Sequence, residues 1–240
     1  LDTATNNFVG AVNSNGANVT LVDGTGGIIL GTTTATGTLN VTSTGGAITD
    51  TGVATVTGVT TLAATSAPGV AADITLDTAT NNFVGAVNSN GANVTLVDGA
   101  GGIILGTTAA TGTLNVTSTG GTITDTGVAT VTGVTTLAAS SAGAPANITL
   151  NTAANDFRAA VNSNGANVTL VDGVGGLDLG TTVATGTLNV TSTGGALTDS
   201  GAATVTGVTT LVASSGDPAA DITLDTATNN FVGAVNSNGA

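Results

Sequence analysis

Residues 1–8 read LDTATNNF, and this block returns at a nearly fixed interval along the chain. It recurs unchanged at 76–83 and 224–231, and in the altered form LNTAANDF at 150–157. A period above about 20 residues is typical of solenoids and propellers, in which each unit buries its apolar face against its neighbours. We therefore predict one continuous array of three copies and part of a fourth, with boundaries at 1–75, 76–149, 150–223 and 224–240.

The composition predicts an ordered chain with an aliphatic core. There are 37 Gly and four Phe among the 240 residues, and Cys, Met, Trp, Tyr, His, Lys and Glu are absent. Disorder requires few apolar residues and a high charge content, whereas the mean hydropathy here is +0.44. The net charge of −13 repels nucleic acid and anionic lipid, so we expect neither as a partner. No apolar run approaches the roughly 20 residues of a membrane span, and we expect no membrane insertion.

A shorter rhythm inside the copy predicts strands. The segments 19–21, 39–41, 60–62 and 74–76 read VTL, LNV, TTL and ITL, and they begin 20, 21 and 14 residues apart. All but the third alternate apolar, polar and apolar residues, which is the period of a half-buried strand. We interpret each copy as four coils, one of them shorter than the others.

Clusters of turn-forming residues separate these segments, as NSNG at 13–16, DGTGG at 23–27 and STGG at 43–46. Such residues tolerate tight or left-handed backbone geometry, so we assign them to corners. Short strands, Gly-rich corners and coils of about 20 residues are typical of a parallel β-helix. The predicted fold is therefore all-β: a right-handed parallel β-helix (β-solenoid) with about four coils per 74–75-residue repeat.

The coil spacing also predicts which residues stack. Equivalent residues of successive coils lie roughly 4.8 Å apart in such a fold. The expected inward ladders are Ile74, Val94, Leu114 and Leu76, Leu96, Val116, with Thr75, Thr95 and Asn115 facing solvent. A propeller needs blades of about 40 residues with aromatic signatures, and a coiled coil or collagen needs heptads or a Gly-X-Y period; none of these patterns is present.

Three segments resemble repeats of filamentous haemagglutinin-like exoproteins, namely GANVTL at 16–21, LNVTSTGGAIT at 39–49 and DITL at 73–76. That family consists of large secreted or surface-tethered bacterial fibres, often exported by two-partner secretion, with β-helical shafts. The resemblance implies an extracellular or cell-surface structural protein, the shaft of an adhesin or filament. Two alternatives stay open: a self-assembling subunit of an extracellular filament or sheath, and an ice- or calcium-binding β-solenoid. The expected partner is the chain itself, through end-to-end coil stacking and lateral bundling, and the receptor is left open.

Catalytic chemistry has few residues to use. Without His, Cys, Lys, Glu or Tyr, the usual pairs of nucleophile and base cannot be assembled. The acidic residues recur with the block, as Asp23, Asp98, Asp172 and as Asp50, Asp125, Asp199. Because a catalytic site in every copy is not expected, we predict that the protein is not an enzyme. We assign no catalytic, cofactor-binding or metal-ligating residue.

Calcium is the one ion that the sequence leaves open. The stretches DGTGGIIL at 23–30 and GGLDL at 175–179 resemble the nonapeptide of calcium-binding β-rolls, but tandem copies nine residues apart are absent. Calcium requires six to eight oxygen ligands, more than an isolated corner carboxylate offers. We therefore expect these Asp residues to cap turns, with no bound cofactor, and keep calcium at the Asp-Gly corners as an alternative.

Other features have simple structural explanations. The four Phe residues, one per copy, are expected to fill a wide part of the coil, and Arg158 to form a local ion pair with Asp156. The third copy is the most divergent, at 155–158 and 177–179, and we attribute its changes to drift. Exposed Thr is favoured by β-propensity, which explains the Thr content without ice binding. Seven Asn-x-Thr glycosylation motifs follow from copying of the repeat, at 18–20, 40–42, 93–95, 115–117, 147–149, 167–169 and 189–191.

Overall fold

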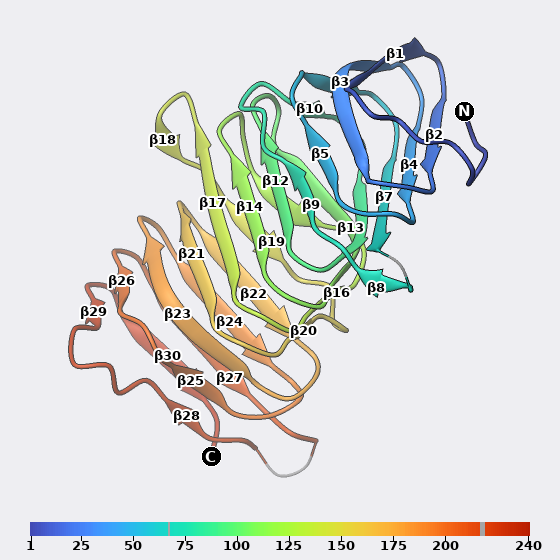
Figure 1. Cartoon of the computed structure of the whole chain (residues 1–240). Coiled ribbons are helices and arrows are strands. Elements are labelled where there is room, and N and C mark those ends of the chain that lie inside the picture. Colours follow the sequence, from blue (N-terminus) through green and yellow to red (C-terminus); the bar gives the residue numbers. More distant parts are fainter. Residues whose placement is uncertain (67, 217–218) are drawn as a thin grey trace.

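The structure is a computed structural model that describes residues 1–66, 68–216 and 219–240, and it shows a rod of stacked coils (Figure 1). The described residues form strands, turns and corners but no helix, so no helix in this part of the chain could cross a membrane. Two long sheets run along the rod, and the chain passes from one to the other in each coil. Nearly all pairings are parallel; the antiparallel strand pairs are two short hairpins, β7 with β8 and β17 with β18.

The first sheet has sixteen strands. They are β1 (Val12–Gly16), β3 (Ile28–Ala35), β5 (Ile48–Asp50), β6 (Ala54–Val56), β9 (Ile74–Leu76), β10 (Asn82–Phe83), β12 (Val94–Asp98), β14 (Leu114–Ser118), β17 (Thr135–Ser141), β18 (Ala144–Pro145), β21 (Val161–Gly165), β23 (Leu177–Ala184), β25 (Leu197–Asp199), β26 (Ala203–Val205), β28 (Ile222–Thr223) and β29 (Asn230–Phe231).

The second sheet has fourteen strands. They are β2 (Val19–Asp23), β4 (Leu39–Ser43), β7 (Thr60–Ser66), β8 (Val70–Ala71), β11 (Val87–Gly91), β13 (Ile103–Ala110), β15 (Ile123–Asp125), β16 (Ala129–Val131), β19 (Ile148–Leu150), β20 (Asp156–Phe157), β22 (Val168–Asp172), β24 (Leu188–Ser192), β27 (Thr209–Ala213) and β30 (Val235–Asn238).

The core consists of aliphatic ladders between the two sheets. Val94 of β12 is aligned with Ile74 on one side and Leu114 on the other, and none of the three is exposed. The next inward column, Leu76, Leu96 and Val116, is at most 1% exposed. Thr75, Thr95 and Asn115 stack between these columns and are partly exposed. The predicted ladders and the predicted fold class are confirmed.

The number of coils in one repeat is three and a half. Strand β1 lies in the first sheet, its counterpart β11 of the next copy lies in the second, and β21 lies in the first again. The cause is the 14-residue step from position 60 to position 74, because β7 belongs to the second sheet and β9 to the first. That step, interpreted from the sequence as a short coil, is half a coil. Seven half-coils per repeat therefore replace the expected value of about four coils.

Because of this half-coil, each repeat presents its features on the side opposite to the previous repeat. Figure 1 shows the hairpin strands β8 and β18 projecting from opposite sides of the rod. At about 4.8 Å per coil, one repeat rises about 17 Å, and the same side recurs every second repeat, after about 34 Å.

Corner geometry explains one recurrent glycine. Gly27 has a φ of +91°, and a Cβ atom there would lie 2.5 Å from the carbonyl oxygen of Ala47 in the next coil. Gly102 and Gly176 repeat this geometry with φ values of +92° and +95°. Only glycine fits, because the backbone is left-handed and the neighbouring coil is too close for a side chain.

The Phe residues fill the interior of the rod. Phe83 and Phe157 are 0% and 1% exposed, and the short strands that carry them pair with β6 and β16. Phe8 and Phe231 are partly buried against the same core. Their predicted role as core residues is confirmed.

Candidate functional site

The exposed corner asparagines hold neighbouring coils together. The Asn93 Oδ1 accepts hydrogen bonds from the N–H and the Oγ1 of Thr113 at 3.0 and 3.1 Å, and its Nδ2 donates to Asp73 at 3.0 Å. Asn18 and Asn167 accept the same bonds from the next coil. These three asparagines belong to Asn-x-Thr motifs, and a glycan attached at Nδ2 would leave the Oδ1 acceptor of these bonds in place. Glycosylation stays a prediction.

A second recurrent group links Asp50 to the following coil. Its Oδ2 accepts a hydrogen bond from the Asn81 Nδ2 at 2.7 Å, and its Oδ1 accepts one from the Asp77 N–H at 3.0 Å. The Asn81 Oδ1 in turn accepts the Ala54 N–H at 2.8 Å. The pairs Asp125–Asn155 and Asp199–Asn229 repeat this arrangement. Buried polar groups that satisfy one another in this way stabilise a corner.

A third group is the Asp-Gly corner that follows β2, β12 and β22. In the second copy the Asp98 Oδ2 accepts the Phe83 N–H at 2.7 Å, and its Oδ1 accepts the Ala100 N–H at 2.8 Å. Burial raises the pKa of Asp98, and these two hydrogen bonds oppose the rise. Asp23 makes the equivalent bonds at 3.1 and 2.9 Å. Both carboxylates act as turn caps, as the sequence predicts.

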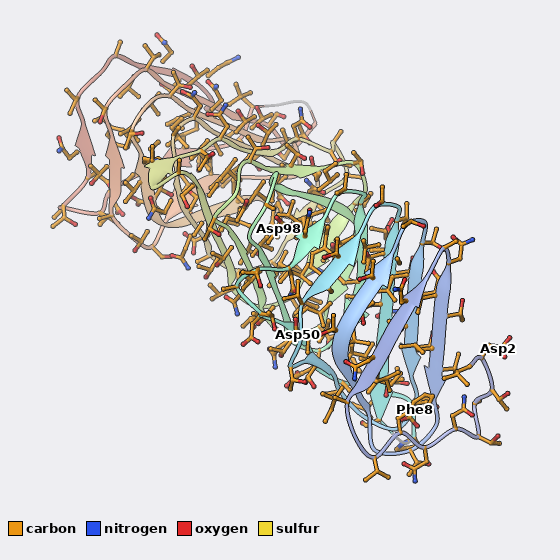
Figure 2. The ribbon with its side chains drawn as sticks, turned by 90° about the horizontal axis from the view of Figure 1, so that it is seen from above. Asp2, Phe8, Asp50 and Asp98 are labelled. Atoms are coloured by element: carbon orange, nitrogen blue, oxygen red, sulfur yellow. The ribbon has the colours of Figure 1, made fainter. Side chains whose placement is uncertain are left out.

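Figure 2 places Asp50 and Asp98 along the rod, away from Asp2 and Phe8 at its N-terminal end. Within 1–66, 68–216 and 219–240, no three acidic side chains form a group that could hold a metal ion. Both oxygens of Asp98 already accept backbone N–H groups. Calcium at the Asp-Gly corners in general stays a prediction.

A shallow groove runs beside this corner. In the second copy it has a volume of about 420 Å³ and is lined in part by Asn82, Val84 and Ile104. Residues 74 positions later in the third copy are Asp156, Arg158 and Asp178. The third-copy groove has a volume of about 330 Å³, with Asp156, Arg158 and the turn 174–176 in its lining. All three changes add a charge, and two of the new residues, Asp156 and Arg158, line the groove of the third copy.

The third-copy corner differs from the second in its hydrogen bonds. The Asp156 Oδ2 accepts two hydrogen bonds from Arg158, at 2.8 Å from Nε and 2.6 Å from Nη2, which confirms the predicted ion pair. The Asp172 Oδ1 accepts the Phe157 N–H at 2.9 Å. The remaining oxygens, Asp156 Oδ1 and Asp172 Oδ2, are buried without a hydrogen-bond partner.

The electrostatics of this corner reflect two neighbouring carboxylates. Burial raises the pKa of Asp172 to about 6; the Phe157 N–H opposes the rise, and the negative charge of Asp156 adds to it. The amides of Val174 and Gly176 lower the pKa somewhat without completing a hydrogen bond to Oδ2. The sequence shows the divergence of this copy, but not that the charge of Asp156 raises the pKa of Asp172 across a corner.

The outward columns carry mixed polar residues. One column of the first sheet runs through Thr75, Thr95, Asn115, Thr136 and Asn162. Asparagine interrupts the threonines, so this column is not a regular Thr lattice. Ice binding stays a prediction that the geometry does not favour.

The fold and these corners define a structural repeat protein, a β-solenoid built from tandem units. Residues 16–90, 91–164 and 165–238 each match the family described as "Repeats of unknown function (DUF5649)", and the chain belongs to this family. The matched units have the period found in the sequence but begin within our first copy, at position 16. No curated protein matches the chain, and no solved structure matches it.

Proposed function

We propose that the chain is the structural shaft of a secreted or surface-attached bacterial fibre, an adhesin or extracellular filament, to which it gives length and rigidity. The main support is the continuity of the core across the copy boundaries. Ile74, near the end of the first copy, is aligned with Val94 of the second, and Ile148 of the second with Val168 of the third. A repeat boundary is therefore no domain boundary, and each added copy lengthens the same rod.

The use of polar groups supports the same proposal. The recurrent Asn and Asp side chains mostly bond to the backbone of adjacent coils. Adding copies thus adds length without adding a reactive site, which favours a non-enzymatic role. The charge of −13 disfavours nucleic acid and anionic membrane as partners and keeps rods in solution. An extracellular location and export by two-partner secretion follow from the resemblance to haemagglutinin-like exoproteins and are part of the proposal.

A second candidate is a self-assembling filament subunit. Val235 of β30 is 48% exposed, whereas its counterpart Val87 is fully buried under the next coil. An exposed coil of this kind accepts a further coil, either from the same chain or from a second copy. End-to-end stacking of copies would use this surface.

Electron microscopy of the native material, combined with the mass of the denatured chain, separates the two candidates. Uniform thin fibres from a chain much larger than 22.3 kDa would support the covalent shaft. Fibres from chains near that mass would support self-assembly, and compact isolated particles would contradict both.

A further inference from the structure

Two short hairpins stand out from the rod at its corners. Thr65 and Ser66 of β7 pair with Ala71 and Val70 of β8, and β17 pairs with β18 in the same way one copy later. The two hairpins project from opposite sides of the rod (Figure 1). The side chain of Val70 is 61% exposed on the first hairpin. This hairpin therefore presents a branched apolar group to solvent, and we call it the Val70 knob.

A groove lies beside the second hairpin. One part of it has a volume of about 230 Å³, and its lining includes Gly143 and Pro145 of the hairpin and Ala138 and Asn164 of the sheet. The other part has a volume of about 300 Å³; Ala138 and Asn164 line it as well, and it continues to Val183 of β23. Because the two parts share lining residues, they form one hollow, which we call the hairpin groove. The residues that line it are all uncharged.

The distribution of charge favours contact between these two surfaces. The chain carries a net charge of −13, but its sequence has no charged residue between Asp50 and Asp73 or between Asp125 and Asp156, the intervals that contain the two hairpins. Acidic rods repel one another least where they carry no charge. Asp73 follows the first hairpin, whereas the second hairpin is followed by Asn147. A contact between the knob and the groove therefore brings one carboxylate to the interface, and a contact between two knobs would bring two.

We propose that the Val70 knob of one copy of this chain seats in the hairpin groove of a second copy that lies beside it. The inference rests on the proposed function, because it requires rods that lie side by side. Knob and groove are different surfaces on opposite sides of the rod, so the contact is heterologous and does not close on itself. Each added rod leaves one knob and one groove free, and the assembly grows into a flat layer one rod thick.

Sedimentation equilibrium of the 240-residue chain at up to about 1 mM, with electron microscopy of the same samples, tests the contact. A contact of this size should be weak, with a dissociation constant of about 10⁻⁴–10⁻³ M, and we expect reversible association and layers of parallel rods. Val70→Asp should weaken the association by at least about tenfold, because it places a charge against an uncharged groove. The matched control is Val59→Asp, which adds the same charge at a 41% exposed valine before the other end of β7 and should leave association unchanged.

A mixing experiment tests whether the two surfaces are different. Val70→Asp removes the knob, and Ala138→Asp, at a partly exposed residue of β17, removes the groove. Each variant alone should stay monomeric where the native chain associates, with circular dichroism confirming its fold. An equimolar mixture should form one-to-one dimers and nothing larger, because one intact knob and one intact groove remain.

Three results would overturn the proposal. They are the absence of association up to about 1 mM, association that Val70→Asp leaves unchanged, and a mixture that forms no dimers. Single rods, or rods joined at their ends alone, would overturn lateral contact and leave the proposed shaft intact. Compact particles would contradict the shaft and the lateral contact together.

Discussion

The corners of the second and third copies follow the same backbone path. They differ in the hydrogen-bond partners of the corner aspartate, which is Asp98 in the second copy and Asp172 in the third. Asp98 holds two N–H groups of its own corner, whereas Asp172 holds one and faces the charge of Asp156. In both copies the corner aspartate bonds to a buried Phe that ends a two-residue strand. Packing therefore fixes the path of the coil, while single side chains at a corner set its chemistry.

The largest loss of stability should follow removal of the buried Phe that both copies have at this corner. Phe83→Ala and Phe157→Ala should each cost about 3–5 kcal/mol, because each leaves a cavity in the core. Urea-induced unfolding of the two variants measures the losses. A loss below about 1 kcal/mol in either variant would show that the ring is not a core element there.

Substitution of the corner aspartate by asparagine should affect the stability of the two corners differently. Asp98→Asn should cost about 1–3 kcal/mol, because an amide NH₂ group cannot accept one of the two N–H groups that the carboxylate holds. Asp172→Asn should be neutral or stabilising at pH 7 without calcium, since it removes a buried like charge and keeps an acceptor for Phe157. Equal losses in the two variants, measured by urea unfolding, would remove the distinction between the corners.

A change of pH should have a smaller effect on the stability of the folded chain. The folded-state pKa of Asp172 is about 6, above its ordinary value, so the folded state binds a proton more tightly than the unfolded chain. The stabilisation is fully present below pH of about 4 and is lost as the pH rises through about 6. In calcium-free buffer, the stability of the native sequence relative to Asp172→Asn should therefore fall over this range. A difference that stays constant from pH 4 to 7 is inconsistent with the raised pKa.

The smallest effect should come from Arg158. Its side chain is 56% exposed, so solvent weakens the ion pair, and Arg158→Val should cost no more than about 1 kcal/mol. Combining it with Asp156→Asn should recover the loss, because the double variant restores the residue types of Asn82 and Val84. Thermal melting of the single and double variants provides the test, and a double variant less stable than Arg158→Val would argue against the pairing.

The sequence predicts the ladders well because period-two alternation and 20-residue spacing determine the register of Ile74, Val94 and Leu114. Spacing alone does not distinguish half a coil from a short coil. The segments at 60–62 and 74–76 look like successive coil starts, yet they lie on opposite sheets. The hydrogen bond from the Phe157 N–H to Asp172 is likewise invisible in the sequence, because the corner that joins these residues is set by tertiary packing.

Distances between spin labels show whether successive repeats face opposite sides of the rod. Thr25, Ala100 and Val174 are exposed, equivalent residues of successive copies, and the chain has no Cys, so paired Cys variants can be labelled cleanly. Double electron–electron resonance should place labels at positions 25 and 174 about 34 Å apart along one side of the rod. The distances from 25 to 100 and from 100 to 174 should each be more than half of that, because position 100 lies on the opposite side. If the distances from 25 to 100 and from 100 to 174 each equal half of the 25–174 distance, each repeat has a whole number of coils. That result would contradict the alternation of sides.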